Sequence, residues 1–457
     1  MNDSNSYPQR PAVESPVQGG LVSAQGVDLD HFQPLDTQVL AWTTDDGAGV
    51  KFVEARGLPI IDVVLRFKAG TTQETVHAGL AALTFYMLDE GSQQHTSTRQ
   101  AEQLERLGAI LEQKLSLDHA TLSFRSLSTS GVFDPALELL IDFVARPSFT
   151  AGALAKIKSE LLQHNASREQ HPRLRARSEA FRHLFKGHQY GNPSGINQQG
   201  IDQTTLADLR RFHQRAYCAS NLNMVIVGDL SLAQAQAVSQ RISQSLPQGW
   251  SAIEPPAAVP AAGTTLNVEQ PGASNAILLA IPMNVPANDP EYPALVLASE
   301  VLGAGIESRL MKALRHRRGL TYDVFTRLKA LSAGGLFTAE WDIAPWHVEG
   351  SQALVEALLR EFIDQGPTQA ELQLARKQLA GRLLRNVAQN KNLAALLTEI
   401  TDQRQPADFL DNYIERLARL TPDDIRAVMQ RRLDPGRTVR VSVGPRAEQQ
   451  PLPALDQ

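Results

Sequence analysis

Histidine, cysteine and serine are the residues of this chain that could carry metal or nucleophilic chemistry, and their spacing matches no recognised catalytic motif. His183 and His188 are five residues apart, so a helix would not place both imidazoles on one face. The single cysteine, Cys218, has no partner for a disulfide or a thiolate cluster, and we expect a small buried residue there. No G-x-S-x-G elbow is present. The sequence therefore gives little support for a hydrolase that acts alone with a catalytic site of its own.

Length and composition describe a protein with a large interior. The chain has 457 residues, of which 42% are hydrophobic and 20% are charged, and this length predicts roughly two to four domains. A net charge of −5 provides no basic field for a phosphate backbone, so we expect no nucleic-acid partner. No run of residues approaches the ~18 apolar residues that a membrane-spanning helix needs, so we expect no membrane partner.

The first thirty residues form a polar leader. Residues 1–30 are rich in Ser, Pro, Gln and Gly and contain no apolar core of signal-peptide length. We therefore expect that the chain as written is not secreted by a signal of its own. The leader is nevertheless similar to the start of a mature exported protein.

The two halves of the chain match each other at a constant offset of 216 residues. The run T-L-A-D-L-R-R-F-H-Q-R from Thr205 matches T-P-D-D-I-R-A-V-M-Q-R from Thr421, and M-V-I-V-G from Met224 matches R-V-S-V-G from Arg440 without a gap. In both helices a threonine is followed three residues later by an aspartate, which is typical of a helix N-terminus. Each half is therefore expected to end in a capped helix, a strand and a glycine turn.

A segment rich in proline and alanine, 247–263, separates the halves, and we expect an extended linker with the hinge there. Strands mixed with segregated helices predict the α+β class, with two homologous domains that each contain a mixed, mostly antiparallel sheet flanked by helices. The predicted domains span 31–246 and 264–448, and a tail follows at 449–457. The predicted elements are 60–67, 78–89, 97–108 and 110–127 in the first half, and 275–281, 292–302, 308–317 and 335–341 in the second.

A further helix is predicted after 367. Thr368 and Glu371 have the spacing of a capping box, which favours a helix start at this point. Apolar residues then recur at helical spacing and predict one buried stripe: Leu372, Ala375, Leu379 and Leu383.

Four short segments of the first half carry a family resemblance. They are F-K-A-G-T-T from Phe67, G-L-A from Gly79, M-L-D-E-G-S from Met87 and E-R-L-G from Glu105. Together they resemble the opening domain of the pitrilysin and mitochondrial-processing-peptidase family of zinc peptidases. In that family H-x-x-E-H follows the Gly-Leu-Ala, so that two imidazoles on one helix face bind Zn²⁺ and the glutamate activates its water.

The matching positions of this chain lack those ligands. Ala82 and Tyr86 stand where the family has histidine, and Phe85 stands where it has glutamate. The resemblance places a third ligand near 162–164, where Glu160 is close but out of register. One carboxylate cannot hold zinc alone, so we expect no metal and no cofactor in this chain.

The second half resembles the second-domain signature of the same family. The matching runs are L-G-A-G-I-E-S-R-L from Leu302 and L-R-H-R-R-G-L-T-Y from Leu314. The resemblance implies that Arg315 and Tyr322 bind the substrate and stabilise the transition state, since a guanidinium fork suits peptide carbonyls and a phenol suits an oxyanion. Taken alone, such residues are more often a solvated charge and a half-buried ring.

The resemblance as a whole implies a half-clam subunit of a heterodimeric zinc metalloendopeptidase. The subunit is expected to be inactive alone, with zinc and the general base supplied by a homologous partner, and to act on extended peptides that add to a sheet edge. The run L-E-Q from Leu111 departs from the Asn-Ala that active relatives often carry on this edge. Because two-chain bacterial relatives are often exported, we expect the periplasm, with the cytoplasm as the alternative. A non-catalytic scaffold or peptide-binding subunit, and a homodimer, remain open.

Overall fold

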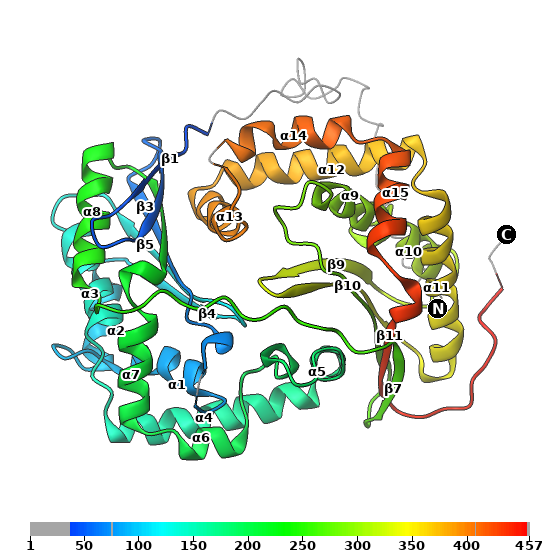
Figure 1. Ribbon diagram of the computed structural model, residues 1–457, viewed down its shortest axis with the longest axis horizontal. Helices are drawn as coiled ribbons and strands as arrows, with labels where there is room; N and C mark the ends of the chain where they lie inside the picture. Colours follow the sequence, from blue (N-terminus) through cyan, green and yellow to red (C-terminus); the bar gives the residue numbers. More distant parts are fainter. Residues whose placement is uncertain (1–36, 75, 407, 455–457) are drawn as a thin grey trace, which may run out of the picture. The chain divides into compact units, whose positions relative to one another are not determined.

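Two β-sheets flanked by helices build the protein (Figure 1). The computed structural model describes residues 37–454, apart from residues 75 and 407. The predicted leader at 1–30 lies outside the described residues.

The two sheets repeat one topology. The strand order is β1-β2-β6-β3-β5-β4 in the first sheet and β7-β11-β8-β10-β9 in the second. Within these sheets β2 runs parallel to β6 and β7 runs parallel to β11, while the other pairs are antiparallel. Apart from β1 the two orders are the same, which confirms the predicted α+β class and the duplication. The strands are β1 (Leu40–Thr43), β2 (Gly49–Glu54), β3 (Ile60–Phe67), β4 (Ile110–Leu115), β5 (Ala120–Leu127), β6 (Leu222–Gly228), β7 (Thr264–Glu269), β8 (Asn275–Pro282), β9 (Val324–Leu331), β10 (Gly334–Ile343) and β11 (Val439–Gly444).

The helices also repeat. Thr205 and Asp208 form a capping box at the start of α7, and Thr421 and Asp424 form the matching box at the start of α15. The helices are α1 (Leu80–Met87), α2 (Ser97–Arg106), α3 (Phe133–Ala145), α4 (Ala151–Gln170), α5 (Pro172–Leu184), α6 (Gln198–Gln203), α7 (Leu206–Ala216), α8 (Leu232–Ser245), α9 (Tyr292–Gly303), α10 (Arg309–Met311), α11 (Val348–Gln365), α12 (Gln369–Val387), α13 (Asn390–Asp402), α14 (Phe409–Arg419) and α15 (Pro422–Arg432).

Two predicted helices have features of note. The capping box of Thr368 and Glu371 is present at the start of α12, and the predicted stripe of four apolar residues on that helix is buried. The helix predicted at 308–317 is present as the short α10 followed by a π-helical turn, Lys312–His316.

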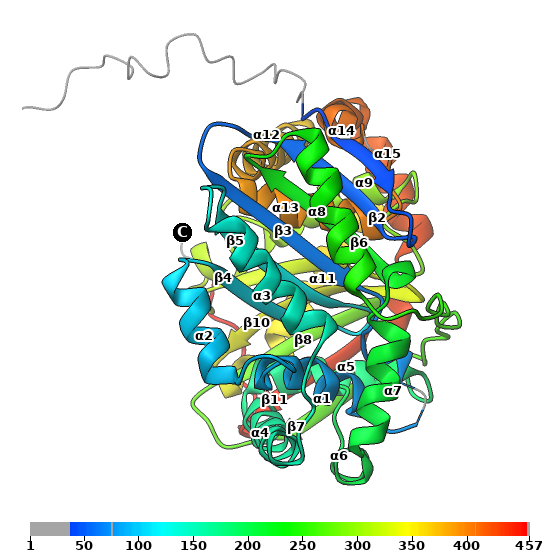
Figure 2. The ribbon, with the colours of Figure 1, turned by 90° about the vertical axis from the view of Figure 1, so that its left-hand side faces the viewer.

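Each sheet packs one face against helices of its own half. Alternate residues of β3, such as Val63 and Leu65, join the large first core together with residues of α1, α3, α7 and α8. Figure 2 shows α3 and α8 lying over one face of this sheet. In the second sheet Ile281 and Phe337 pack in the same way against α9, α11, α12 and α15.

The opposite face of each sheet is covered by a helix from the other half. Val64 of β3 and Val225 of β6 pack against Leu397 of α13. Reciprocally, Leu278 of β8 packs in one cluster with Phe181 of α5. The two halves thus exchange equivalent helices, and each half completes the core of the other.

The segment between the halves is extended and attached to both. Residues 247–263 form neither helix nor strand. The Asn221 side chain contacts the linker twice, donating to the Trp250 carbonyl at 2.9 Å and accepting from the Ala252 amide at 2.6 Å. Further along, the Ala258 amide donates to the Ala333 carbonyl at 2.8 Å, and the Ala261 amide donates to the Leu184 carbonyl at 2.9 Å. The predicted domain bounds and the hinge stay predictions.

Candidate functional site

Helix α1 carries the positions at which the resemblance expects zinc ligands. Its first turn is held by Glu74, whose Oε1 accepts hydrogen bonds from the Gly79 amide at 3.0 Å and the Ala81 amide at 2.9 Å. Burial raises the pKa of this carboxyl to about 8, even though the two backbone hydrogen bonds act in the opposite direction. Gly79, with φ of 103°, has a left-handed backbone that favours glycine.

The side chains at those positions are apolar or phenolic. Ala82 and Phe85 are buried, and Tyr86 is partly exposed. The Phe85 and Tyr86 rings meet edge to face, with 5.4 Å between their centroids. A methyl group and a phenyl group have no lone pair for Zn²⁺, so these residues do not fit the metal.

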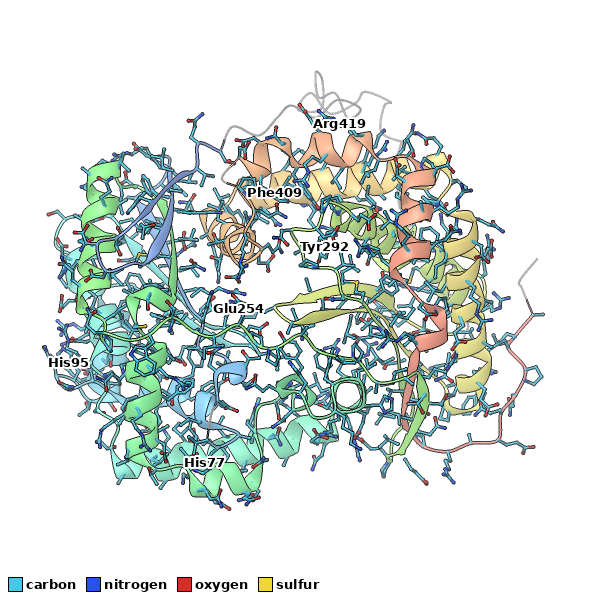
Figure 3. The ribbon with its side chains drawn as sticks, viewed as in Figure 1. His77, His95, Glu254, Tyr292, Phe409 and Arg419 are labelled. Atoms are coloured by element: carbon cyan, nitrogen blue, oxygen red, sulfur yellow. The ribbon has the colours of Figure 1, made fainter. Side chains whose placement is uncertain are left out.

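A cavity of about 1070 Å³ adjoins this helix. Ala82 and Tyr86 line it, whereas Phe85 belongs to the first core. Figure 3 shows two further lining residues, Glu254 on the linker and Tyr292 at the start of α9. The wall therefore combines elements of both halves with the segment that joins them.

Helix α4 presents no carboxylate to this cavity at the expected third-ligand position. Its lining residues are Leu161, His164 and Arg168. Glu160 is exposed and lies 4.0 Å from the Lys156 ammonium, so it does not face Ala82 across the cavity. In the described part of the chain, no group of three or more His, Cys, Asp or Glu side chains could hold a metal ion.

A charged cluster in the cavity wall joins the two halves. Arg66 of β3 forms an ion pair with Asp402 at the end of α13, and His119 Nε2 lies 3.6 Å from an oxygen of the same carboxylate. Burial raises the pKa of Asp402 to about 6 despite the Arg66 charge. Burial, helped by the charges of Arg66 and Lys68, lowers the pKa of His119 to about 3, so this imidazole is neutral at physiological pH.

Arg315 and Tyr322 contact each other and lie apart from the cavity-lining residues. The Arg315 Cζ atom is 4.5 Å from the centroid of the Tyr322 ring, the geometry of a cation–π contact. The Tyr322 side chain is 81% exposed. The guanidinium has no ion-pair partner among the described residues, so both groups are available to another molecule.

The backbone between these two residues explains the contact. The π-helical turn Lys312–His316 is followed by Gly319, which has φ of 60° and donates its amide to the Arg315 carbonyl at 2.9 Å. The Leu320 amide donates to the Leu314 carbonyl at 2.8 Å, which completes a helix-ending motif and turns the chain back toward its helix. Tyr322 therefore returns to the level of Arg315 just before β9 begins.

Arg173 is a residue near this pair that the sequence did not indicate. Its guanidinium lies 2.6 Å from Asp323 Oδ1 and 2.6 Å from Asp342 Oδ2, and its Cζ is 5.6 Å from the centroid of the Phe325 ring. The only signal is the run P-R-L-R-A-R at the start of α5. That run reads equally well as a solvated helix surface, because its partners lie 150 or more residues later.

Comparisons with known proteins match both halves. The description "Insulinase (Peptidase family M16)" fits residues 56–194, and "Peptidase M16 inactive domain" fits residues 203–379. A crystal structure of a peptidase M16 inactive domain from Pseudomonas fluorescens is 34% identical, with a TM-score of 0.87, and covers 91% of this chain and 100% of that one.

Two further similarities are more distant. The "Non-peptidase homolog YmxG" of Helicobacter pylori is 25% identical over 333 residues, covering 73% of this chain and 77% of that protein. The periplasmic protease PqqL of Escherichia coli shares the fold, with a TM-score of 0.75 and 15% identity, over 96% of this chain and 49% of PqqL.

The duplicated sheets, together with a helix α1 that lacks the zinc-ligating residues, define a metallopeptidase homologue of the insulinase and pitrilysin kind. The chain belongs to peptidase family M16. Residues 203–379 match the inactive-domain description of that family, and this range contains Arg315 and Tyr322. Among the described residues, no helix is long and apolar enough to cross a membrane.

Proposed function

We propose that this chain is the non-zinc-binding subunit of a two-chain zinc endopeptidase. The observation that carries the proposal is the exposed contact between Arg315 and Tyr322. A cation and a phenol held together at a surface, with no ion-pair partner for the cation in the described chain, suit contact with a peptide better than a structural role. Ala82, Phe85 and Tyr86 leave this chain without a hydrolytic centre, so the partner must supply it.

In this arrangement the two chains divide the chemistry. A homologous partner that retains H-x-x-E-H would hold the Zn²⁺ and would supply the glutamate as the general base, and the metal would serve to activate water. Arg315 donates hydrogen bonds to carbonyl oxygens of the bound peptide. The Tyr322 hydroxyl donates to the oxygen that gains negative charge in the transition state.

The sheet edges suit an extended substrate. Strand β4 ends the first sheet and strand β9 ends the second, so along each of them one row of backbone groups is unpaired within its sheet. Such edges accept a peptide by strand addition with little demand on its sequence. The substrate class is therefore peptides. We also propose a periplasmic location, supported by the polar leader and by the location given in the name of the PqqL protease.

A second candidate is a scaffold or peptide-binding subunit without a catalytic role. The names of two relatives favour it, since one is a non-peptidase homologue and the other an inactive domain. Under this reading Arg315 and Tyr322 contribute nothing to turnover. The two candidates therefore differ in one measurable quantity, the effect of these side chains on the rate of the assembled pair.

The experiment combines this chain with a family member that retains H-x-x-E-H and follows cleavage of a quenched fluorescent peptide. We expect the mixture to cleave much faster than either protein alone, and Tyr322→Phe to reduce kcat by about 10²–10³-fold. Arg315→Ala is expected to raise KM as well, because it removes peptide contacts. The control is Arg419→Ala on α14, whose arginine forms its ion pair within the described chain with the helix neighbour Glu415. Unchanged turnover in both Tyr322→Phe and Arg315→Ala would establish the scaffold instead.

A further inference from the structure

Arg173 connects the first half of the chain to the loop that carries Tyr322. It lies in the first turn of α5, the helix that the first half contributes to the second sheet. Its guanidinium donates to both oxygens of Asp342 on β10, at 3.0 and 2.9 Å, and to both oxygens of Asp323, at 3.2 and 2.6 Å. Asp323 directly follows Tyr322.

The place of these carboxylates in the sheet explains why they need a cation. The ladder between β9 and β10 ends at the pair Val324 and Trp341. One residue further out, Asp323 and Asp342 face each other with no backbone pairing between them. Two carboxylates opposite each other on neighbouring strands repel. The guanidinium between them replaces that repulsion with two ion pairs, and it thereby holds residue 323 beyond the last hydrogen-bonded pair.

Two further observations agree with this role. The hydrogen bonds that Arg173 donates are the main cause of the lowered pKa of Asp323, so the interaction favours the charged carboxylate. The guanidinium also packs over the Phe325 ring, and the Cζ atom of Arg327 lies 4.6 Å from the centroid of the same ring. The start of β9 is therefore attached to α5 through both a carboxylate and a ring.

We propose that Arg173 is a positioning residue that fixes the Tyr322 phenol against Arg315 by holding Asp323 beside Asp342. The proposal rests on the function proposed above for its effect on turnover. Its structural part concerns this chain alone and can be measured without a partner. Loss of the guanidinium leaves two facing carboxylates, which separate and release the segment from Gly319 to Val324.

The test compares Arg173→Ala with Arg177→Ala as a matched control. Arg177 lies one helical turn further along α5 and forms an equally close ion pair across the halves, with Glu340 at 2.6 Å, but it does not contact the loop. Hydrogen exchange in the isolated chain is expected to accelerate at least about tenfold for amides 319–324 in Arg173→Ala and to stay unchanged there in Arg177→Ala. A double variant, Arg173→Ala with Asp342→Asn, is expected to recover most of the protection because one of the facing charges is removed.

Turnover of the assembled pair gives the second readout. Arg173→Ala is expected to lower kcat about tenfold or more with KM nearly unchanged, since a displacement of about 1 Å at a reacting group costs up to 10²-fold. It should have no further effect in a Tyr322→Phe background. Unchanged exchange in Arg173→Ala, or an equal loss of kcat in Arg177→Ala, overturns the positioning role. Faster exchange combined with an inert Tyr322→Phe supports the positioning role and rejects the proposed function.

Discussion

Arg66 and Asp402 form an ion pair although they come from opposite halves of the chain, and both side chains are largely buried. Removing one member of such a pair leaves a buried charge without its partner. Arg66→Ala and Asp402→Ala are therefore each expected to lower the free energy of unfolding by about 2–4 kcal/mol. The double variant is expected to cost less than the sum, by about 0.5–3 kcal/mol. Urea denaturation measures all three, and additive costs would show that the pair is not coupled.

The linker is expected to be dispensable for the cohesion of the two halves. Helix α13 completes the first sheet and α5 completes the second, so the contact between the halves is a shared core. A protease site inserted after Pro256, which is exposed, should be cut without separating the fragments. Size-exclusion chromatography under native conditions is expected to show one species with the elution volume of the uncut protein. Two separate fragments would instead support independent domains that are joined at a hinge.

His213 makes stability depend on acid pH. Its ring stacks on Tyr217 at 5.2 Å, its Nε2 donates to the Val144 carbonyl at 2.8 Å, and burial lowers its pKa to about 4. Between pH 6.5 and 4 the unfolded chain binds a proton that the folded chain does not, so stability falls on acidification by up to about 1.4 kcal/mol per pH unit.

A variant isolates this contribution from the other buried groups. Asp402 and Glu74 have raised pKa values and act with the opposite sign, because their protonated forms favour the folded state. His213→Gln retains an N–H donor but does not titrate. The difference in unfolding free energy between wild type and variant is expected to narrow steadily from pH 6.5 to 4. If this difference in unfolding free energy stays constant with pH, the folded protein does not hold His213 in its neutral form.

Reintroducing the zinc-motif glutamate is expected to be costly. Phe85 is fully buried in the first core, so Phe85→Glu places a carboxyl group among apolar side chains and removes a ring from them. We expect a loss of at least about 3 kcal/mol in unfolding free energy, comparable to the removal of a buried phenylalanine. Ala82→Ser, on the same helix, serves as a milder control. A loss below about 1 kcal/mol for Phe85→Glu would mean that helix α1 can rotate so that the side chain at position 85 reaches the cavity instead of the core.

The sequence predicts the central strands well and the edges poorly. Strand β3 has the predicted bounds and β8 is one residue longer, because both are covered by helices on two faces and consist mainly of apolar residues, although β3 also contains Asp62 and Arg66. Strands β1, β2, β7 and β9 were not predicted. In β7 intermediate and exposed residues alternate, a weak pattern beside a linker of similar polarity.

The residues of the candidate site likewise fall into some that the sequence predicts and one that it does not. Positions Ala82, Phe85 and Tyr86 followed from the family resemblance, and the structure places Ala82 and Tyr86 on a cavity. Arg173 could not be found from spacing, since Asp323 is 150 residues away and becomes its neighbour only through the exchange of α5. Local patterns determine helices and strands, whereas the cross-half ion pairs depend on how the finished halves pack.

The exchanged helices also bear on how such a chain can arise. A polypeptide with a single repeat would leave one apolar sheet face open to water, since the helix that covers it belongs to another copy. Two identical copies can close both faces by trading that helix, as domain-swapped dimers do. The present chain has the arrangement that fusion of two such copies would give, so a change in a donated helix alters the core of the receiving sheet in the other half.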